Sequence, residues 1–118
     1  MIQKFDGVNL YSKNPLRCKR FYHDLLGIPV LSDDLRDFDG AQFRFGENSP
    51  KLYLWDDARR EGRKIGPVQL VFHCDDLDLT YQELKEKGAD IDPPVSTDWG
   101  GRELRLCDPD GNEILLLD

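Results

Sequence analysis

Four large aromatic side chains carry the clearest chemical signal in this sequence. Tyr11 lies in the first predicted strand, whereas Tyr53 and Trp55 alternate along a later one, Lys51–Trp55. Successive side chains of a strand point to opposite faces, so the three residues are placed on one face, with Trp99 on a nearby loop. Aromatic rings bind flat ligands by stacking and cations by cation–π contact. The alternative is that these rings fill a cleft or form a dimer interface.

Polar residues on the same predicted face could recognise a ligand. Asn9, Gln69 and His73 all belong to it. A general base needs an orienting partner and a substrate within reach, and a polar pocket-wall residue needs neither. The second role is therefore the simpler interpretation of His73, and a metal-free acid–base enzyme that uses His73 with Glu103 is left open.

Arg102 follows a Trp-Gly-Gly loop and is a candidate partner for a ligand carboxylate, since a guanidinium binds carboxylates in a bidentate manner. The competing interpretation is an exposed charged strand in which Arg105 pairs with Glu103.

The elements that position these side chains occur twice. Val8–Asn14 and Leu70–Asp76 are both strand patterns that run into a polar helix cap, and the second follows the first by 62 residues. The short apolar strands Lys51–Trp55 and Glu113–Leu117 have the same offset. A helical pattern ends at a glycine after each first strand, which is the usual residue at a helix C-terminus. The chain is therefore predicted to repeat a β-α-β-β-β unit.

This repeat predicts a single α+β domain, residues 1–118, built of two tandem modules. Module one spans 1–56, a polar linker spans 57–67, and module two spans 68–118. A charged turn is expected around Asp33–Gly40. Helices must cover one face of each sheet, because their apolar stripes need a partner. The other face is expected to be concave and to line a cleft.

Composition narrows the class of protein. Of the 118 residues, 39% are hydrophobic and 33% charged, as in an ordinary globular domain. The formal net charge of −7 argues against a nucleic-acid partner, which needs a basic face. No apolar run is long enough for a membrane helix, and no signal peptide is recognisable. Three cysteines without paired spacing favour reduced thiols in the cytoplasm.

Three motifs together resemble a known family. They are Phe21–Gly27 (FYHDLLG) at a helix end, Phe72–Asp78 (FHCDDLD) at a strand-to-helix step, and Asp108–Asn112 (DPDGN) at a turn. In this order they resemble the vicinal oxygen chelate superfamily, also called the glyoxalase/bleomycin resistance protein/dioxygenase family. The resemblance implies paired β-α-β-β-β modules, a U-shaped mixed sheet with helices on its outer face, and usually a homodimer.

The enzymes of this family hold a divalent metal by one residue on the first and one on the last strand of each module. Those positions correspond here to Gly7, Tyr53, Gln69 and Leu115. Glycine and leucine offer no ligand atom, tyrosine is an uncommon ligand and glutamine is a weak neutral one. We therefore expect no metal and no other cofactor. A shift of strand register that involved Asn9 or Glu113 is the alternative that keeps a metal site possible.

The sequence thus favours a small-molecule-binding protein of the glyoxalase/bleomycin-resistance type. It would sequester an aromatic or cationic compound in a metal-free cavity, and no nucleic acid or membrane partner is expected. The expected ligand-binding residues are Asn9, Tyr11, Tyr53, Trp55, Gln69, His73, Trp99 and Arg102. The alternative is a metal-dependent lyase, isomerase or dioxygenase with an altered ligand set, and the sequence does not decide whether the chain is an enzyme.

Overall fold

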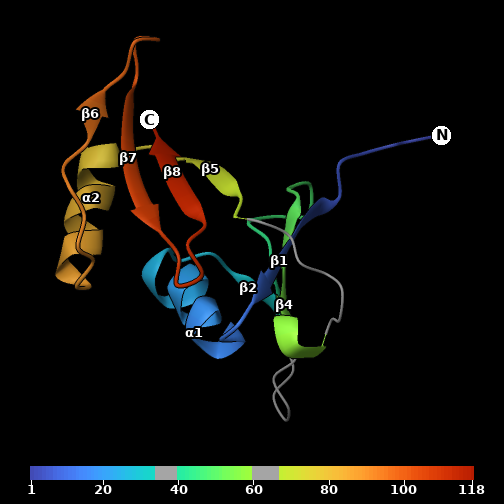
Figure 1. The fold of residues 1–118 in the computed structure, drawn as a ribbon. Helices are drawn as coiled ribbons and strands as arrows, with labels where there is room; N and C mark the ends of the chain where they lie inside the picture. The colour runs from blue at the N-terminus through green and yellow to red at the C-terminus, as the bar shows by residue number, and fades with distance from the viewer. Residues whose placement is uncertain (34–39, 60–66) are drawn as a thin grey trace. The chain divides into compact units, whose positions relative to one another are not determined.

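The computed structural model describes residues 1–33, 40–59 and 67–118 (Figure 1). Contacts divide the chain into unit 1, Met1–Gly66, and unit 2, Pro67–Asp118. The second unit begins one residue before the predicted start of module two. Of the predicted charged turn and linker, residues 34–39 and 60–66 lie outside the described residues.

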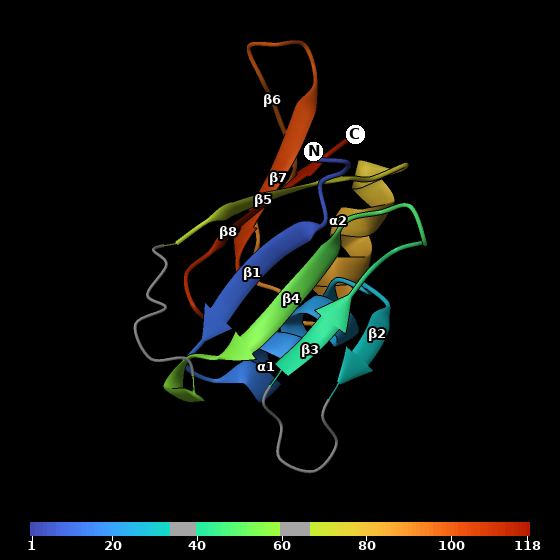
Figure 2. The same ribbon diagram turned by 90° about the vertical axis from the view of Figure 1, so that its right-hand side faces the viewer.

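Unit 1 follows the order β-α-β-β-β. Its elements are β1 (Gly7–Ser12), α1 (Pro15–Arg20), the π-helical turn η1 (Phe21–Leu25), β2 (Val30–Asp33), β3 (Gly40–Phe43), β4 (Lys51–Asp56) and a short 3-10 helix, η2 (Asp57–Arg59). The strands form one mixed sheet in the order β1-β4-β3-β2, with β1 parallel to β4 and the other pairs antiparallel. Figure 2 looks onto this sheet, with α1 behind it.

Alternation along the strands of unit 1 gives the sheet one buried and one open face. Leu10, Leu54 and Phe43 are buried, whereas the residues between them are half-buried or exposed. The helix covers the buried face, since α1 contacts β1 and β4 and the ring of Tyr22 packs 6.1 Å from that of Phe43. The predicted assignment of side chains to the two faces is confirmed for this unit.

The helix of unit 1 begins as predicted and ends differently. The side chain of Asn14 caps α1 by accepting from the Arg17 amide. The predicted helix to Leu26 is only partly α-helical, because the Leu26 N–H donates to the Phe21 carbonyl, five residues earlier, and widens the last turn. Gly27 then takes a positive φ of 74° and ends the helix as expected.

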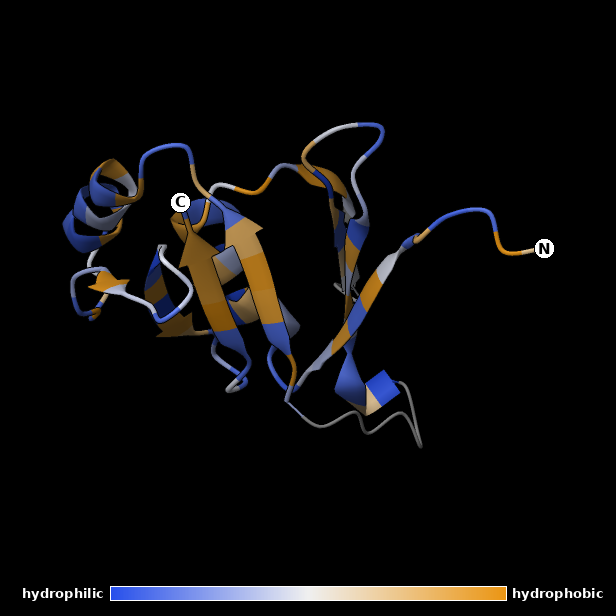
Figure 3. Ribbon diagram, turned by 90° about the horizontal axis from the view of Figure 1, so that it is seen from above, coloured by the Kyte–Doolittle hydropathy of each residue, from blue (hydrophilic) through white to orange (hydrophobic). Residues whose placement is uncertain are grey.

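Unit 2 repeats the order. Its elements are β5 (Gln69–His73), α2 (Leu77–Glu86), β6 (Val95–Ser96), β7 (Arg102–Cys107) and β8 (Glu113–Leu117). The sheet order β5-β8-β7-β6 matches that of unit 1, with β5 parallel to β8 and β6 at the edge. The prediction of two β-α-β-β-β modules is therefore confirmed. Figure 3 shows the apolar stretch of β8, next to the C-terminus, in orange.

The turn between β7 and β8 is held by buried polar groups. The Asp108 carboxylate accepts from the backbone amides of Asp110 and Asn112 and, at 2.8 Å, from the Asn112 side-chain amide. The Asn112 side-chain oxygen in turn accepts from the Val68 N–H just before β5. This motif therefore ties the start of unit 2 to its last hairpin.

Candidate functional site

The open face of unit 1 carries a pair of aligned aromatic rings on β4. The centroids of Tyr53 and Trp55 lie 6.5 Å apart and their planes differ by 8°. We call these two rings the aromatic platform. They lie on one face because the residues alternate along the strand with buried Leu52 and Leu54.

Polar partners on neighbouring segments hold both rings in place. The Trp55 indole N–H donates to the Asn9 side-chain oxygen on β1 at 2.9 Å, and the Tyr53 hydroxyl donates to the Asp6 carboxylate just before β1. The hydrogen bond from Tyr53 lowers the pKa of the Asp6 carboxyl, and the same bond raises the pKa of the Tyr53 hydroxyl. Two ring orientations are thus fixed before any ligand arrives.

Two glycines leave room for the platform on either side of β4. A Cβ on Gly7 would overlap the Lys51 carbonyl oxygen and come within 3.0 Å of the Tyr53 ring. A Cβ on Gly40 would overlap the Leu54 carbonyl oxygen and lie 3.4 Å from the Trp55 ring. A larger residue at either position would push the strand or the ring away. Tyr11, the third predicted aromatic residue, is half-buried and lies opposite Trp55 in the β1–β4 register.

The open face of unit 2 carries a polar cluster beside the apolar side chains of Val71, Leu115 and Leu117. The Gln69 amide donates to the Glu113 carboxylate directly across the β5–β8 ladder. Arg105 joins the same group, with Nη1 3.1 Å from Glu113 and Nε 2.9 Å from Glu103. Both carboxylates raise the pKa of the Arg105 guanidinium, and Glu103 has the larger effect. The expected pairing of Arg105 with Glu103 is confirmed.

His73 lies at the exposed end of β5, where its side chain is 72% exposed and its Nε2 is 3.7 Å from Asp75. Leu117 separates it from Glu103 in the ladder, so the two residues are two strands, or about 9–10 Å, apart. They do not contact each other directly, and an acid–base pair would need a substrate between them. Trp99 is exposed on its loop, with its ring over Gly101.

Arg102 lies on the helix-covered face of its sheet, with Leu104 and Leu106. Its guanidinium forms a bidentate pair with Asp78 of α2 and a further pair, at 2.9 Å, with Asp118. Asp78 and then Asp118 raise its pKa, and Arg102 lowers that of the Asp118 carboxyl. Two carboxylates therefore already pair with the Arg102 guanidinium, and its contact with a ligand stays a prediction.

Comparison with known proteins places this architecture in a family. The model of the Glyoxalase/Bleomycin resistance protein/Dioxygenase superfamily matches residues 4–116. The chain belongs to this superfamily. Its relatives include the uncharacterized protein YetH of Bacillus subtilis (strain 168), which is 26% identical over 98% of both chains.

Solved structures of the superfamily share the fold. TnmS3, an antibiotic binding protein from Streptomyces sp. CB03234, is 27% identical, with a TM-score of 0.80 over 98% of this chain and 95% of its own. Lactoylglutathione lyase from Agrobacterium tumefaciens is 17% identical, with a TM-score of 0.78 over 98% and 93%. The second likeness shows the fold alone.

The metal positions of the superfamily are poorly supplied with ligand atoms here. Gly7 has no side chain, and the Tyr53 hydroxyl is bonded to Asp6. In unit 2, Leu115 is a buried hydrocarbon side chain and the Gln69 amide is bonded to Glu113. A divalent ion needs several oxygen or nitrogen donors that converge, so these four residues do not fit a metal of the superfamily type.

Sequence reasoning missed two residues of the site. Asp6 precedes β1 and therefore lies outside the ladder in which side chains alternate between the two faces. The only signal in the sequence was a polar residue directly before the strand. Arg44 follows β3, and the alternation Gly40–Arg44 (GAQFR) would have placed it on the open face with Gln42. No role for Arg44 was predicted from the sequence.

Proposed function

We propose that this protein binds a small aromatic compound against the aromatic platform of unit 1, without metal catalysis. The observation that carries the proposal is the pair of nearly parallel rings, Tyr53 and Trp55, fixed by Asp6 and Asn9. Rings that are already oriented lose little conformational entropy when a flat ligand stacks on them. Gln69, His73, Tyr11 and Trp99 remain candidate contacts, and the homodimer stays a prediction.

A solved structure of the superfamily supports the proposal that this protein binds a small molecule. TnmS3, at 27% identity over nearly the whole chain, is described as an antibiotic binding protein, so a member of this superfamily with similar architecture binds a small molecule. The poor ligand set at the metal positions supports binding over metal-dependent catalysis.

A thermal-shift panel of aromatic compounds and divalent metals tests the proposal. A compound that binds only the folded protein stabilises it by about 2.7 kcal/mol at a hundred times its Kd. We expect aromatic compounds to raise the Tm, Trp55→Leu to remove the rise, and the control variant Leu79→Ala, at an exposed site on α2, to retain it. The proposal fails if Trp55→Leu responds like the unmodified protein. About one equivalent of tightly held divalent ion, lost on Gln69→Ala, would support the metal-dependent enzyme instead.

A further inference from the structure

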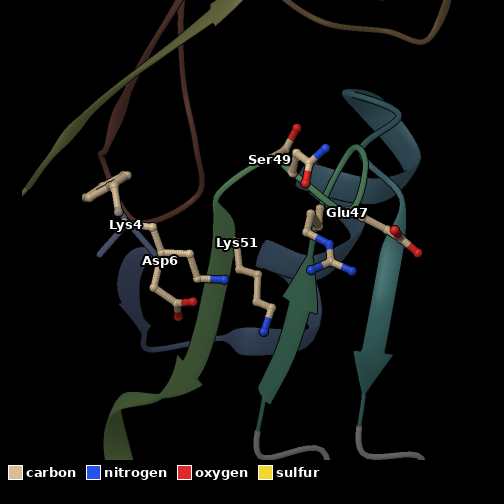
Figure 4. Close-up of a pocket in the computed structure, with 8 residues that line it drawn as sticks. Lys4, Asp6, Glu47, Ser49 and Lys51 are labelled. Carbon is tan, nitrogen blue, oxygen red and sulfur yellow. The ribbon is translucent and has the colours of Figure 1, made fainter. Parts of the chain in front are cut away.

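A pocket of about 270 Å³ adjoins the aromatic platform in unit 1 (Figure 4). The N-terminal segment, the end of β3 and the turn into β4 line it, and its charged and polar residues include Lys4, Asp6, Arg44, Glu47, Ser49 and Lys51. Asp6 and Lys51 belong to both features, because Asp6 accepts the Tyr53 hydroxyl and the Lys51 ammonium lies 5.8 Å from the centre of the Tyr53 ring.

The charge of this pocket differs from that of the whole chain. Three cations and two carboxylates line it, which leaves one positive charge in excess in a protein of net charge −7. Among the residues that the structure describes, Lys4, Arg44 and Lys51 form no ion pair. One of the two carboxylates, Asp6, is already bonded to the platform.

The position of Lys51 favours a negatively charged ligand at the aromatic platform. Its ammonium takes up the cation–π position on Tyr53, so a cationic ligand at that ring would face a like charge. An anionic group would meet the ammonium and, across the end of the β3–β4 ladder, the half-buried Arg44. Guanidinium and ammonium groups make their strongest hydrogen bonds to carboxylate and phosphate oxygens.

The pKa of the Asp6 carboxyl reflects the same positive charges. After the Tyr53 hydrogen bond, the charges of Lys51, Lys4 and Arg44 all act to lower the pKa of this carboxyl. A second anion that enters the pocket experiences these same three cations.

We propose that the ligand is an aromatic acid, which stacks on Tyr53 and Trp55 and places its anionic group in the pocket beside Lys51 and Arg44. This inference rests on the proposed function and narrows its small aromatic compound to an anionic one. The ring centres of Trp55 and Tyr53 are 6.5 Å apart, and the Lys51 ammonium is 5.8 Å from the centre of the Tyr53 ring. A fused aromatic acid of two or three rings can therefore stack on both rings and reach the ammonium.

Three naphthalene compounds of similar shape test the inference by calorimetric titration at neutral pH. Naphthalene-2-carboxylate is expected to bind about tenfold more tightly than the neutral naphthalene-2-carboxamide, and the cationic 2-naphthylmethylammonium is expected to bind most weakly. Lys51→Gln and Arg44→Gln should each weaken carboxylate binding about five- to tenfold and leave carboxamide binding within about twofold. Lys85→Gln, which removes the same charge from an exposed site on α2, should change neither.

The outcomes separate the two proposals. If none of the three compounds binds, the proposed function fails. If the carboxamide or the ammonium compound binds as tightly as the carboxylate, the platform stands and the anionic specificity is overturned. Equal weakening of carboxylate binding by Lys85→Gln would show a general charge effect and would also overturn it.

Discussion

Replacement of Asn112 by alanine should destabilise the protein strongly, because its buried side chain joins two segments by hydrogen bonds. Asn112 is 8% exposed, and its side chain donates to the Asp108 carboxylate at 2.8 Å and accepts from the Val68 N–H at 2.9 Å. A hydrogen bond to a charged group contributes about 1.5–3 kcal/mol and a neutral one about 0.5–1.5 kcal/mol. The alanine variant is therefore expected to lose about 2–4.5 kcal/mol of the free energy of unfolding.

Thermal unfolding followed by circular dichroism measures this loss. For a chain of this length, each kcal/mol lowers the Tm by about 4 °C, so Asn112→Ala should unfold at a temperature about 8–18 °C lower. Asn48→Ala, at an exposed asparagine in the turn before β4, should change the Tm by no more than about 2 °C. A Tm of Asn112→Ala within 2 °C of the unmodified protein would refute the view that this turn is a buried structural junction.

Three further outcomes follow from the site and its surroundings. Tyr53→Phe should raise the pKa of Asp6, followed by NMR, toward the ordinary value of about 3.9, because the phenolic hydrogen bond that lowers it is gone. The lowered pKa of Asp6 stabilises the folded protein at pH values above the ordinary pKa, and this stability is lost as the pH falls through the lowered pKa. The Tyr53→Phe variant should therefore lose less stability in acid than the unmodified protein. Gly40→Ala should cost about 1–3 kcal/mol in denaturant unfolding, since its Cβ would overlap the backbone of β4. Cys107 is exposed and burial raises the pKa of the Cys74 thiol, so a thiol reagent at pH 8 should label Cys107 first, as mass spectrometry of the peptides will show.

Each of these outcomes has a control. Tyr81→Phe removes a hydroxyl from α2 and should leave the Asp6 pKa unchanged; a shift of similar size there would argue against the assigned bond. Gly46→Ala adds a Cβ to open space at a glycine without positive φ and should be neutral or slightly stabilising. If the two glycine variants behave alike, the close approach at Gly40 is not real. Labelling of Cys74 ahead of Cys107 would contradict the burial of that thiol.

The repeat and the strand alternation made most of the fold predictable. Tyr53, Trp55 and Asn9 lie on the open face because a ladder forces side chains to alternate, and the sequence shows that alternation. The same rule would have placed Arg102 with Leu104 on the helix-covered face, had the strand been followed from its first residue. Pattern alone could not identify Asp6 as the partner of Tyr53, because their contact joins segments 47 positions apart and lies outside the ladder.

The most direct test of the central claim uses the protein with Trp99→Phe, in which Trp55 is the sole tryptophan. Titration with naphthalene-2-carboxylate should change the Trp55 fluorescence in a saturable way, with one ligand per chain, because the ligand stacks on that indole. The Tyr53→Phe form of the same protein should keep the response, since its ring remains, whereas Tyr53→Ala should weaken it. A Trp55 signal that stays unchanged at millimolar ligand, while the compound still raises the Tm, would place the binding site elsewhere and contradict the account.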